Sequence, residues 1–306
     1  MRQRPVRDID IKGGMTVAAL VGQFAEAGGF TATKFADAVD ITKKMLKDKD
    51  CVKFLSFPAC INATGTRGVI AKMLRERMAD VVITTCGTVD HDLARSWKDY
   101  YHGSFEMDDA GLRDRGVNRL GNVLVPNDSY GTIIEQKVQP FLQQMWDSGK
   151  KRIGTKELLW KVGEMCKEDS ILYWAQRNKI PVYVPGITDG SFGAQLWLFS
   201  QEHRELCIDL MQDERELADI VFPARKTGAL IIGGGISKHH TIWWNQFKEG
   251  LDYAVYISTA AEHDGSLSGA RTREAVSWGK IGRRARHVTV DGDATILLPL
   301  LVAALK

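Results

Sequence analysis

The feature that most constrains this chain is an alternation of short apolar runs, rich in β-branched residues, with longer amphipathic stretches. The runs predict strands at residues 51–57, 80–85, 180–184, 206–210, 229–233, 253–258 and 287–290. The stretches between them predict helices, among them residues 64–78, 92–101, 133–147, 214–222 and 239–248. Strands that are apolar throughout are typical of parallel sheets covered by helices. We therefore expect an α/β fold with a doubly wound, mainly parallel sheet of about 6–7 strands and helices on both faces.

The domain organisation follows from the length and evenness of this pattern. A chain of 306 residues can bury the core of one large α/β domain. No internal repeat, low-complexity tract or Pro/Gly/Ser linker interrupts it. Residues 103–131 are richer in Gly, Asp, Asn and Arg, which predicts an excursion from the sheet rather than a boundary. We expect a single domain over residues 1–306.

Charge and cysteine usage narrow the functional classes. The formal net charge is only +3, and the basic residues are scattered, so no nucleic-acid partner is expected. The densest basic cluster, Arg283, Arg284 and Arg286, is either a solvated turn or a contact for an acidic partner. Five cysteines without a CxxC pair argue against a disulfide framework or zinc site, and favour a reducing cytosol.

The apolar segments give no sign of a membrane protein or an exported one. The first residues, MRQRPVRDIDIKGG, lack the apolar core of a signal peptide. The longest apolar stretch, residues 296–305, is about half the length of a membrane span. We expect a cytoplasmic protein that needs neither a membrane nor a metal ion.

Loops that follow the predicted strands hold most of the candidate binding residues, because ligands of open parallel sheets lie beyond the carboxyl ends of the strands. Gly233, Gly234 and Gly235 join a strand to a helix, so their N–H groups can approach a phosphate. The motif is not a GxGxxG fingerprint, because Lys238 replaces the third glycine, and a tight turn is the alternative. The Cys86-Gly87-Thr88 turn is a weaker candidate of the same kind.

Carboxylates and histidines at the strand ends have two interpretations each. Asp189 and Asp293 can either cap a helix or accept ribose hydroxyls. His239 and His240 open a predicted helix, where a neutral imidazole can accept a proton from an amine. Adjacent histidines point in different directions, so we do not expect a metal pair.

The polar segment 262–280 is too long for an ordinary connection, which indicates a functional loop. Lys280 follows Trp278 by two residues. A lysine among apolar and aromatic groups loses its proton more easily, and the free amine forms imines with carbonyl or iminium carbons. Glu274 can hold an amine cation, and Trp278 can offer it a cation–π face. A surface lysine is the alternative.

Several motifs together resemble the deoxyhypusine synthases. The resemblance is strongest across residues 227–301, with GGGISKHH, LDYAVYISTA and DGSLSGARTREAVSWGKI. It continues through GGFTATKFADAV, VITTCGTVDHDL, NRLGNVLVPND and YWAQRNKIPVYVPGITDGS. LWLFSQEHR and HHTIWWNQF are similar to the archaeal branch. The SGAxxxEAVSWGK pattern is far more specific than any glycine motif.

This resemblance implies a transferase with a Rossmann-like architecture that borrows NAD within one catalytic cycle. NAD oxidises spermidine, and the aminobutyl group passes to an enzyme lysine as an imine. The group is then handed to one lysine of the hypusine-bearing translation initiation factor and reduced by NADH. Family members are homotetramers with active sites between paired subunits.

The resemblance also implies a role for individual residues. The covalent lysine corresponds to Lys280 and the amine-binding base to His239. The amine site corresponds to Glu274, Trp278, Gly265, Ser266 and Asp90. The NAD contacts correspond to Thr85, Cys86, Gly87, Asp189, Gly234, Thr259, Ala260, Asp264, Asp293 and Ala294.

The amine-binding positions differ from the eukaryotic pattern. Ala194 and Leu267 stand where that pattern has acids, and its paired glutamates become Asp90 and His91. Nearby carboxylates that can replace the lost charges are Asp90, Glu262 and Asp264. Two alternatives follow. One is a homospermidine-synthase-like transferase acting on small amines such as putrescine or agmatine, and the other is an NAD-binding protein without catalysis.

Overall fold

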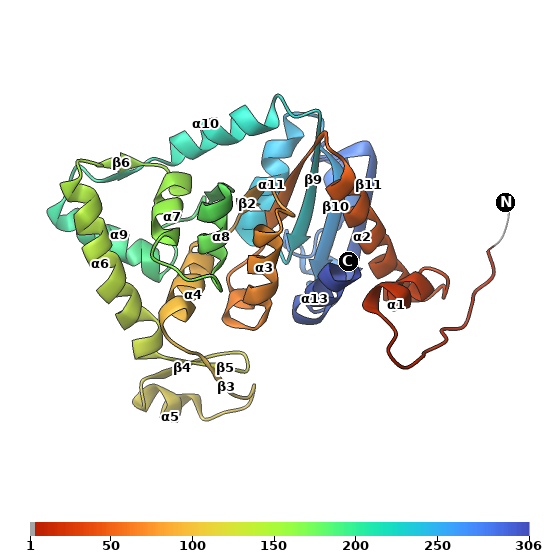
Figure 1. Cartoon of the computed structure of the whole chain (residues 1–306), viewed down its shortest axis with the longest axis horizontal. Coiled ribbons are helices and arrows are strands. Elements are labelled where there is room, and N and C mark those ends of the chain that lie inside the picture. The colour runs from red at the N-terminus through yellow and green to blue at the C-terminus, as the bar shows by residue number, and fades with distance from the viewer. Residues whose placement is uncertain (1–3, 306) are drawn as a thin grey trace. The chain divides into compact units, whose positions relative to one another are not determined.

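The computed structural model describes residues 4–305 (Figure 1), so residues 1–3 and 306 of the predicted domain lie outside the described part. Backbone contacts divide the chain into two compact units. The first contains residues 4–57, 78–81 and 218–305, and the second contains 58–77 and 82–217. The chain passes from the second unit to the first within α10 (Leu210–Val221). A single domain over the whole chain stays a prediction.

Four parallel strands form the sheet of the first unit, in the order β11 (Ile281–Asp291), β10 (Leu251–Ser258), β9 (Lys226–Ile232) and β1 (Cys51–Ser56). Ala254 pairs with Ala229 on one side and with His287 on the other. β9 and β10 are almost entirely buried, as continuous apolar strands between two layers of helices should be.

The pairing of β10 with β11 contains an irregularity that bulges the edge strand. Leu251 pairs with Ile281, but Tyr253 pairs with Arg286, so β11 has extra residues between the two pairs. Arg283 and Arg284 lie in this bulge and are exposed, as is Arg286. The basic cluster therefore lies on a bulge of β11.

Helices cover both sides of this sheet (Figure 1). α2 (Phe30–Lys47) contacts β1, β10 and β11, with α1 (Val17–Phe24) and α13 (Ala294–Ala304) packed on it. α11 (Gly235–Gln246) lies on the other side of the strands from α2 (Figure 1). α12 (Thr272–Ser277) packs on β10 and β11, preceded by the short helix η3 (Glu262–Asp264). The segment read as one long polar loop is therefore partly helical.

The second unit holds two parallel strands, β2 (Val81–Ile83) and β7 (Val182–Tyr183), paired at Val82 and Val182. Its remaining strands form a parallel pair, β6 (Arg152–Ile153) with β8 (Cys207–Ile208), and an antiparallel sheet of β3 (Tyr101–His102), β5 (Val123–Pro126) and β4 (Val117–Leu120). Its helices are η1 (Cys60–Ala63), α3 (Thr66–Arg75), α4 (Cys86–Trp97), α5 (Asp109–Asp114), η2 (Asn127–Ser129), α6 (Gly131–Asp147), α7 (Thr155–Gly163), α8 (Ile171–Asn178) and α9 (Ser191–Glu202).

The predicted α/β fold is confirmed, but some details of the prediction are wrong. The strand expected at 206–210 forms as β8, but it pairs with β6 rather than joining the main strands. α11 begins at Gly235, so His239 lies in its second turn rather than at its start. Gly235 has φ +67°, and this left-handed conformation lets the helix begin directly after the glycine turn.

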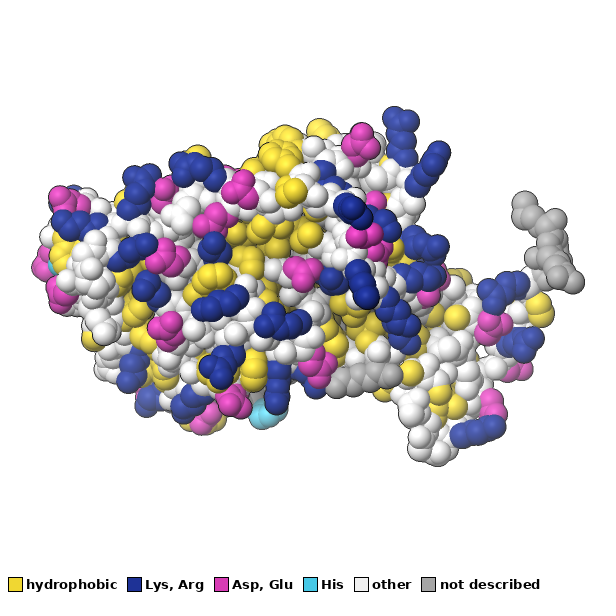
Figure 2. Space-filling view, turned by 45° about the horizontal axis from the view of Figure 1, so that its top comes forward, with side chains coloured by type: hydrophobic (Ala, Val, Ile, Leu, Met, Phe, Trp, Pro, Cys, Tyr) yellow, Lys and Arg dark blue, Asp and Glu magenta, His cyan; other side chains and the backbone are white. Residues whose placement is uncertain are grey.

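The surface agrees with the small net charge. On the face shown in Figure 2, basic and acidic side chains are intermixed. Within residues 4–305, every helix is too short or too polar to cross a bilayer.

Candidate active site

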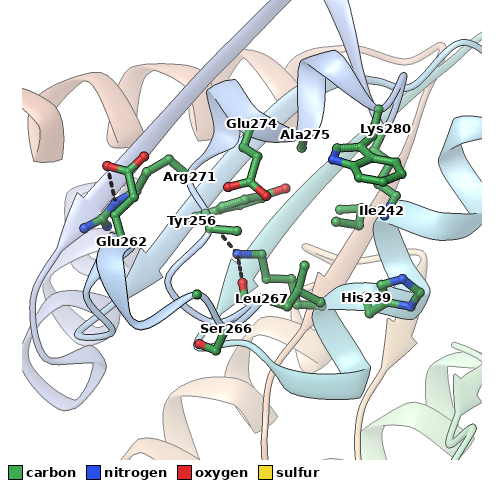
Figure 3. Close-up of a pocket in the computed structure, with 14 residues that line it drawn as sticks. His239, Ile242, Tyr256, Glu262, Ser266, Leu267, Arg271, Glu274, Ala275 and Lys280 are labelled. Carbon is green, nitrogen blue, oxygen red and sulfur yellow. Dashed lines mark hydrogen bonds and ion pairs between the residues drawn. The ribbon is translucent and has the colours of Figure 1, made fainter.

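A pocket of about 370 Å³ lies in the first unit, between α11, α12, β10 and the segment that follows β10. Six residues chosen from the sequence line it: Lys280, His239, Glu274, Trp278, Gly265 and Ser266. Glu262 and Arg271 lie at one end, and His239 and Lys280 lie at the other, with Glu274 and Tyr256 between them (Figure 3). The pocket is thus an elongated slot with charged groups along its length.

Lys280 is buried, with only 8% of its surface exposed, so the surface-lysine interpretation is wrong. Its Nζ lies 5.3 Å from the centre of the Trp278 ring and 5.9 Å from that of Trp243. Its backbone N–H donates to the Ala275 carbonyl at 2.9 Å, and its carbonyl accepts from Leu251 at 3.1 Å. The backbone of Lys280 is therefore fixed, and its side chain lines the slot near two indole rings.

His239 stacks on Trp243, one helical turn further along α11, with 5.7 Å between ring centres. Burial lowers the pKa of His239, and the positive charge of Lys280 lowers it further. The imidazole therefore stays neutral at physiological pH and can accept a proton from an amine in the slot. Trp243 was missed in the sequence, although its i, i+4 spacing from His239 was a usable signal.

The two glutamates of the pocket, Glu262 and Glu274, differ in their ion pairs. Glu262 forms ion pairs with Arg273 and, at 4.0 Å, with Arg271. In the described part of the chain no lysine or arginine forms an ion pair with Glu274. Of the two, Glu274 is therefore the carboxylate available to a cationic ligand. Leu267 lines the same pocket and adds an apolar wall.

Two further pocket residues, Lys238 and Tyr256, were not assigned a role from the sequence. Lys238 is 1% exposed, and its Nζ donates to the carbonyls of Leu267 and Ala270, each at 2.7 Å. The same Nζ lies 4.3 Å from the centre of the Tyr256 ring. Burial lowers the pKa of Lys238 to about 8, although the negative charge of Glu274 partly offsets this by raising the pKa. The buried Tyr256 hydroxyl has no hydrogen-bond partner.

The predicted cofactor residues of the first unit gather at the carboxyl ends of three neighbouring strands. Gly234 follows β9, Thr259 and Ala260 follow β10, and Asp293 and Ala294 follow β11. The Asp293 carboxylate accepts from the backbone N–H and hydroxyl of Thr295, both at 2.8 Å, so the capping interpretation is confirmed. One oxygen of Asp264 accepts from the Ser266 N–H at 2.7 Å.

The predicted residues of the second unit also gather behind two paired strands. Thr85, Cys86 and Gly87 follow β2 at the start of α4, and Asp189 follows β7 just before α9. A Cβ on Gly190 would lie 2.8 Å from the Cys86 sulfur, so the two turns are in contact. The Thr85 hydroxyl is buried and has no hydrogen-bond partner.

Asp90 is fully buried in the second unit and already accepts four hydrogen bonds, the longest from the Cys86 thiol at 3.9 Å. It accepts from the Tyr130 hydroxyl at 2.7 Å and from the N–H groups of Ser191 and Phe192 at 2.8 and 2.7 Å. Burial nevertheless raises the pKa of this carboxyl. The carboxylate therefore anchors the first turn of α9, and its predicted contact with an amine stays a prediction. Within residues 4–305, no three His, Cys, Asp or Glu side chains are grouped to hold a metal ion.

Comparison with known proteins gives one consistent family. The family model described as "DS: Deoxyhypusine synthase" matches residues 19–305. A "Probable deoxyhypusine synthase" of Picrophilus torridus is 54% identical over 302 residues, which cover 98% of this chain and 96% of the relative. One from Thermoplasma acidophilum is 54% identical over 301 residues, with the same coverage. Among solved structures, a "putative deoxyhypusine synthase" of Entamoeba histolytica has a TM-score of 0.66 at 20% identity, covering 98% of this chain and 95% of that one.

Proposed function

Because the chain belongs to the deoxyhypusine synthase family, we propose that it transfers the aminobutyl group of spermidine, in an NAD-dependent reaction, to one lysine of the hypusine-bearing translation initiation factor. The group travels as an imine on Lys280. The observation that carries this proposal is the buried Lys280, whose amine lies 5.3 and 5.9 Å from the centres of two indole rings and which lines a slot together with His239 and Glu274.

The predicted cofactor residues fit NAD. The glycine turn at 233–235 leads into the N-terminus of α11, where backbone N–H groups can face a phosphate. Asp293, at the start of α13 in the same unit, offers a carboxylate for ribose hydroxyls. NAD bound by these residues would supply the hydride acceptor of the first half-reaction and the hydride donor of the second.

The chain's own residues perform the remaining steps. Glu274 holds an ammonium group of the amine, and the Trp278 face provides a cation–π contact. His239 accepts a proton from the amine nitrogen as the carbon–nitrogen double bond forms. The Lys280 amine then attacks the imine carbon, and the rest of the spermidine leaves as a free amine. The acceptor lysine displaces Lys280 in the same way, which divides one difficult substitution into easier steps.

The test is transfer of labelled spermidine to the archaeal initiation factor in the presence of NAD. We expect transfer with the wild type, no transfer with Lys280→Ala, and normal transfer with a control, Lys226→Ala, at an exposed lysine outside the pocket. Borohydride should trap an aminobutyl adduct whose mass maps to Lys280. Full transfer by Lys280→Ala, or none by the wild type, would contradict the proposal.

A second candidate is favoured by Leu267, which lines the slot where the eukaryotic pattern has an acid. A slot with fewer carboxylates suits an aminobutyl transfer to or from a small amine, such as putrescine or agmatine. Incubation with NAD and free amines, without any protein acceptor, separates the two: a small-amine product supports this alternative. An NAD-binding protein without catalysis would bind NAD but leave no trapped adduct.

We further propose that the protein is a cytoplasmic homotetramer, as the family implies. Exposed aromatic side chains of the first unit are the supporting observation. They include Trp243 and Phe247 of the α11 region, Phe222 and Trp278. Exposed aromatic groups beside a pocket are typical of protein interfaces.

A further inference from the structure

The strongest unexplained feature of the pocket is the buried ammonium group of Lys238. Burial of a lysine without an ion pair is costly, so such a residue is retained only where its hydrogen bonds are needed. Two of its three donors are used on the carbonyls of Leu267 and Ala270, and its charge lies over the Tyr256 ring. All three partners line the slot.

The segment 265–270 forms one wall of the slot and contains little regular structure of its own. Its internal bonds are turns, such as Ala270 N–H to the Ser266 carbonyl at 3.2 Å. Its side-chain tie to the sheet is a bond of 3.2 Å from the Ser258 hydroxyl, on β10, to the Ser268 carbonyl. The position of this wall therefore depends on the few groups that reach it from α11 and β10.

Gly234, just before α11, and Lys238, in its first turn, both act on this wall. Gly234 allows Ser268 to approach so closely that a Cβ at 234 would overlap it, at 2.5 Å from the Ser268 Cβ. Lys238, four residues later, then binds the carbonyls on both sides of Ser268. Gly234 is the N-cap residue of α11 and Lys238 lies in its first turn, so both reach the wall from the N-terminal end of this helix.

We propose that Lys238 is a positioning residue for the amine slot, which fixes the wall at residues 265–270 and so sets the affinity for the amine. The proposal rests on the proposed function, because it takes the slot to be the amine site. Lys238 holds the backbone of Leu267 and Ala270 so that the Leu267 side chain faces the slot opposite Glu274. Without this tie the wall at residues 265–270 moves, so the width of the slot changes while Lys280 and His239 keep their positions.

The test compares three variants of the full-length enzyme with spermidine as the amine. Lys238→Met removes the donors and keeps the length of the side chain. Lys238→Arg restores a cation with several donors. Lys248→Met is the matched control, because Lys248 is also largely buried but lies outside the slot. We expect Lys238→Met to raise the spermidine KM about tenfold, the scale of lost charged hydrogen bonds, with the NAD KM within about twofold of the wild type.

Recovery of most of the spermidine KM by Lys238→Arg, and a wild-type KM in Lys248→Met, would support the proposal. An unchanged spermidine KM in Lys238→Met, or an equal rise in the spermidine and NAD KM values, would overturn it. Wild-type enzyme that is inactive with spermidine refutes the proposed function instead. Spermidine binding by calorimetry then decides the role of Lys238, and equal affinity of wild type and Lys238→Met would overturn it.

If Lys238→Met fails to fold, Lys238→Gln takes its place, with hydrogen exchange of the amides in 265–270 as the readout. Faster exchange confined to this segment supports the proposal, whereas unchanged exchange contradicts it.

Discussion

Two buried lysines of the same slot differ in how far the sequence reveals them. Lys280 lies in a specific motif beside Trp278, and its environment matches the expected one. Lys238 was noticed only as a misfit in a glycine motif, because its partners are backbone carbonyls some 30 residues away, Leu267 and Ala270. The sequence does not show which backbone carbonyls a buried side chain will bind.

The lowered pKa of Lys238 gives a prediction at this scale. An unfolded lysine titrates near pH 10.4, but Lys238 titrates at about 8 in the fold. Between these values the unfolded state binds more protons, so raising the pH stabilises the fold through this group. The stability of the wild type relative to Lys238→Met should therefore rise by ~2 kcal/mol from pH 7 to pH 10. Urea unfolding at both pH values measures this, and parallel pH dependences would contradict it.

A second prediction concerns the buried ion pair of Arg67 and Asp92. Asp92 also accepts from the Ser170 hydroxyl and the N–H groups of Ile171 and Leu172. Asp92→Asn leaves the Arg67 charge without its buried partner and should lower the free energy of unfolding by about 3–5 kcal/mol. Asp169→Asn removes only the exposed partner of Arg67 and should cost less than about 1 kcal/mol. Urea denaturation midpoints compare them, and similar losses would show that Arg67 does not depend on Asp92.

At the scale of elements, the sequence predicted the long apolar strands well and the helix starts poorly. β1, β9 and β10 form where the sequence has continuous apolar runs, which predict buried strands. α4 and α11 begin several residues earlier than predicted. The start of α11 is set by the left-handed glycine turn at Gly235 rather than by apolar spacing. α12 was missed since its six residues are too few for a periodic signal.

The cap of α13 gives a prediction that separates structure from binding. Asp293→Ala removes the cap and should cost about 1 kcal/mol, whereas Asp293→Ser keeps a capping oxygen and should cost little. Both variants lack the carboxylate proposed for ribose, so both should bind NAD more weakly. Thermal unfolding and NAD titration by fluorescence measure the two effects. Normal NAD binding by Asp293→Ser would leave Asp293 with the capping role only.

Gly234 gives a second prediction for this scale. A methyl group at this position overlaps Ser268, so Gly234→Ala must displace the wall of the slot or the start of α11. We expect the free energy of unfolding to fall by about 1–3 kcal/mol and the affinity for spermidine to weaken. Gly68→Ala is the control, since a Cβ there meets nothing within 4 Å. Equal behaviour of the two variants in thermal unfolding would count against close packing at Gly234.

At the scale of the whole molecule, the α/β class followed from strand–helix alternation, but the partition into two units did not. The first unit combines segments from both ends of the chain, and such discontinuity has no signature in local composition. The departure at residues 103–131 was visible as a change in composition, although its own three-stranded sheet was not.

The exposed aromatics of the first unit allow a prediction about assembly. If they form a subunit interface, replacing Phe222 and Phe247 with serine should reduce the tetramer to smaller species. Light scattering coupled to size exclusion measures this. Phe105→Ser, at an exposed aromatic of the second unit, is the control. A monomeric wild type would contradict the proposed tetramer.

The bulge of β11 lies between two predicted site residues, one at each end of the strand. Lys280 directly precedes the strand, and Asp293 follows its other end, while residues between the Leu251 and Tyr253 pairings loop out. The bulge thus sets the register in which the second part of β11 pairs with β10. A change of length between Ile281 and Arg286 would therefore shift Asp293 relative to the neighbouring strands, while Lys280 stays tied to Leu251.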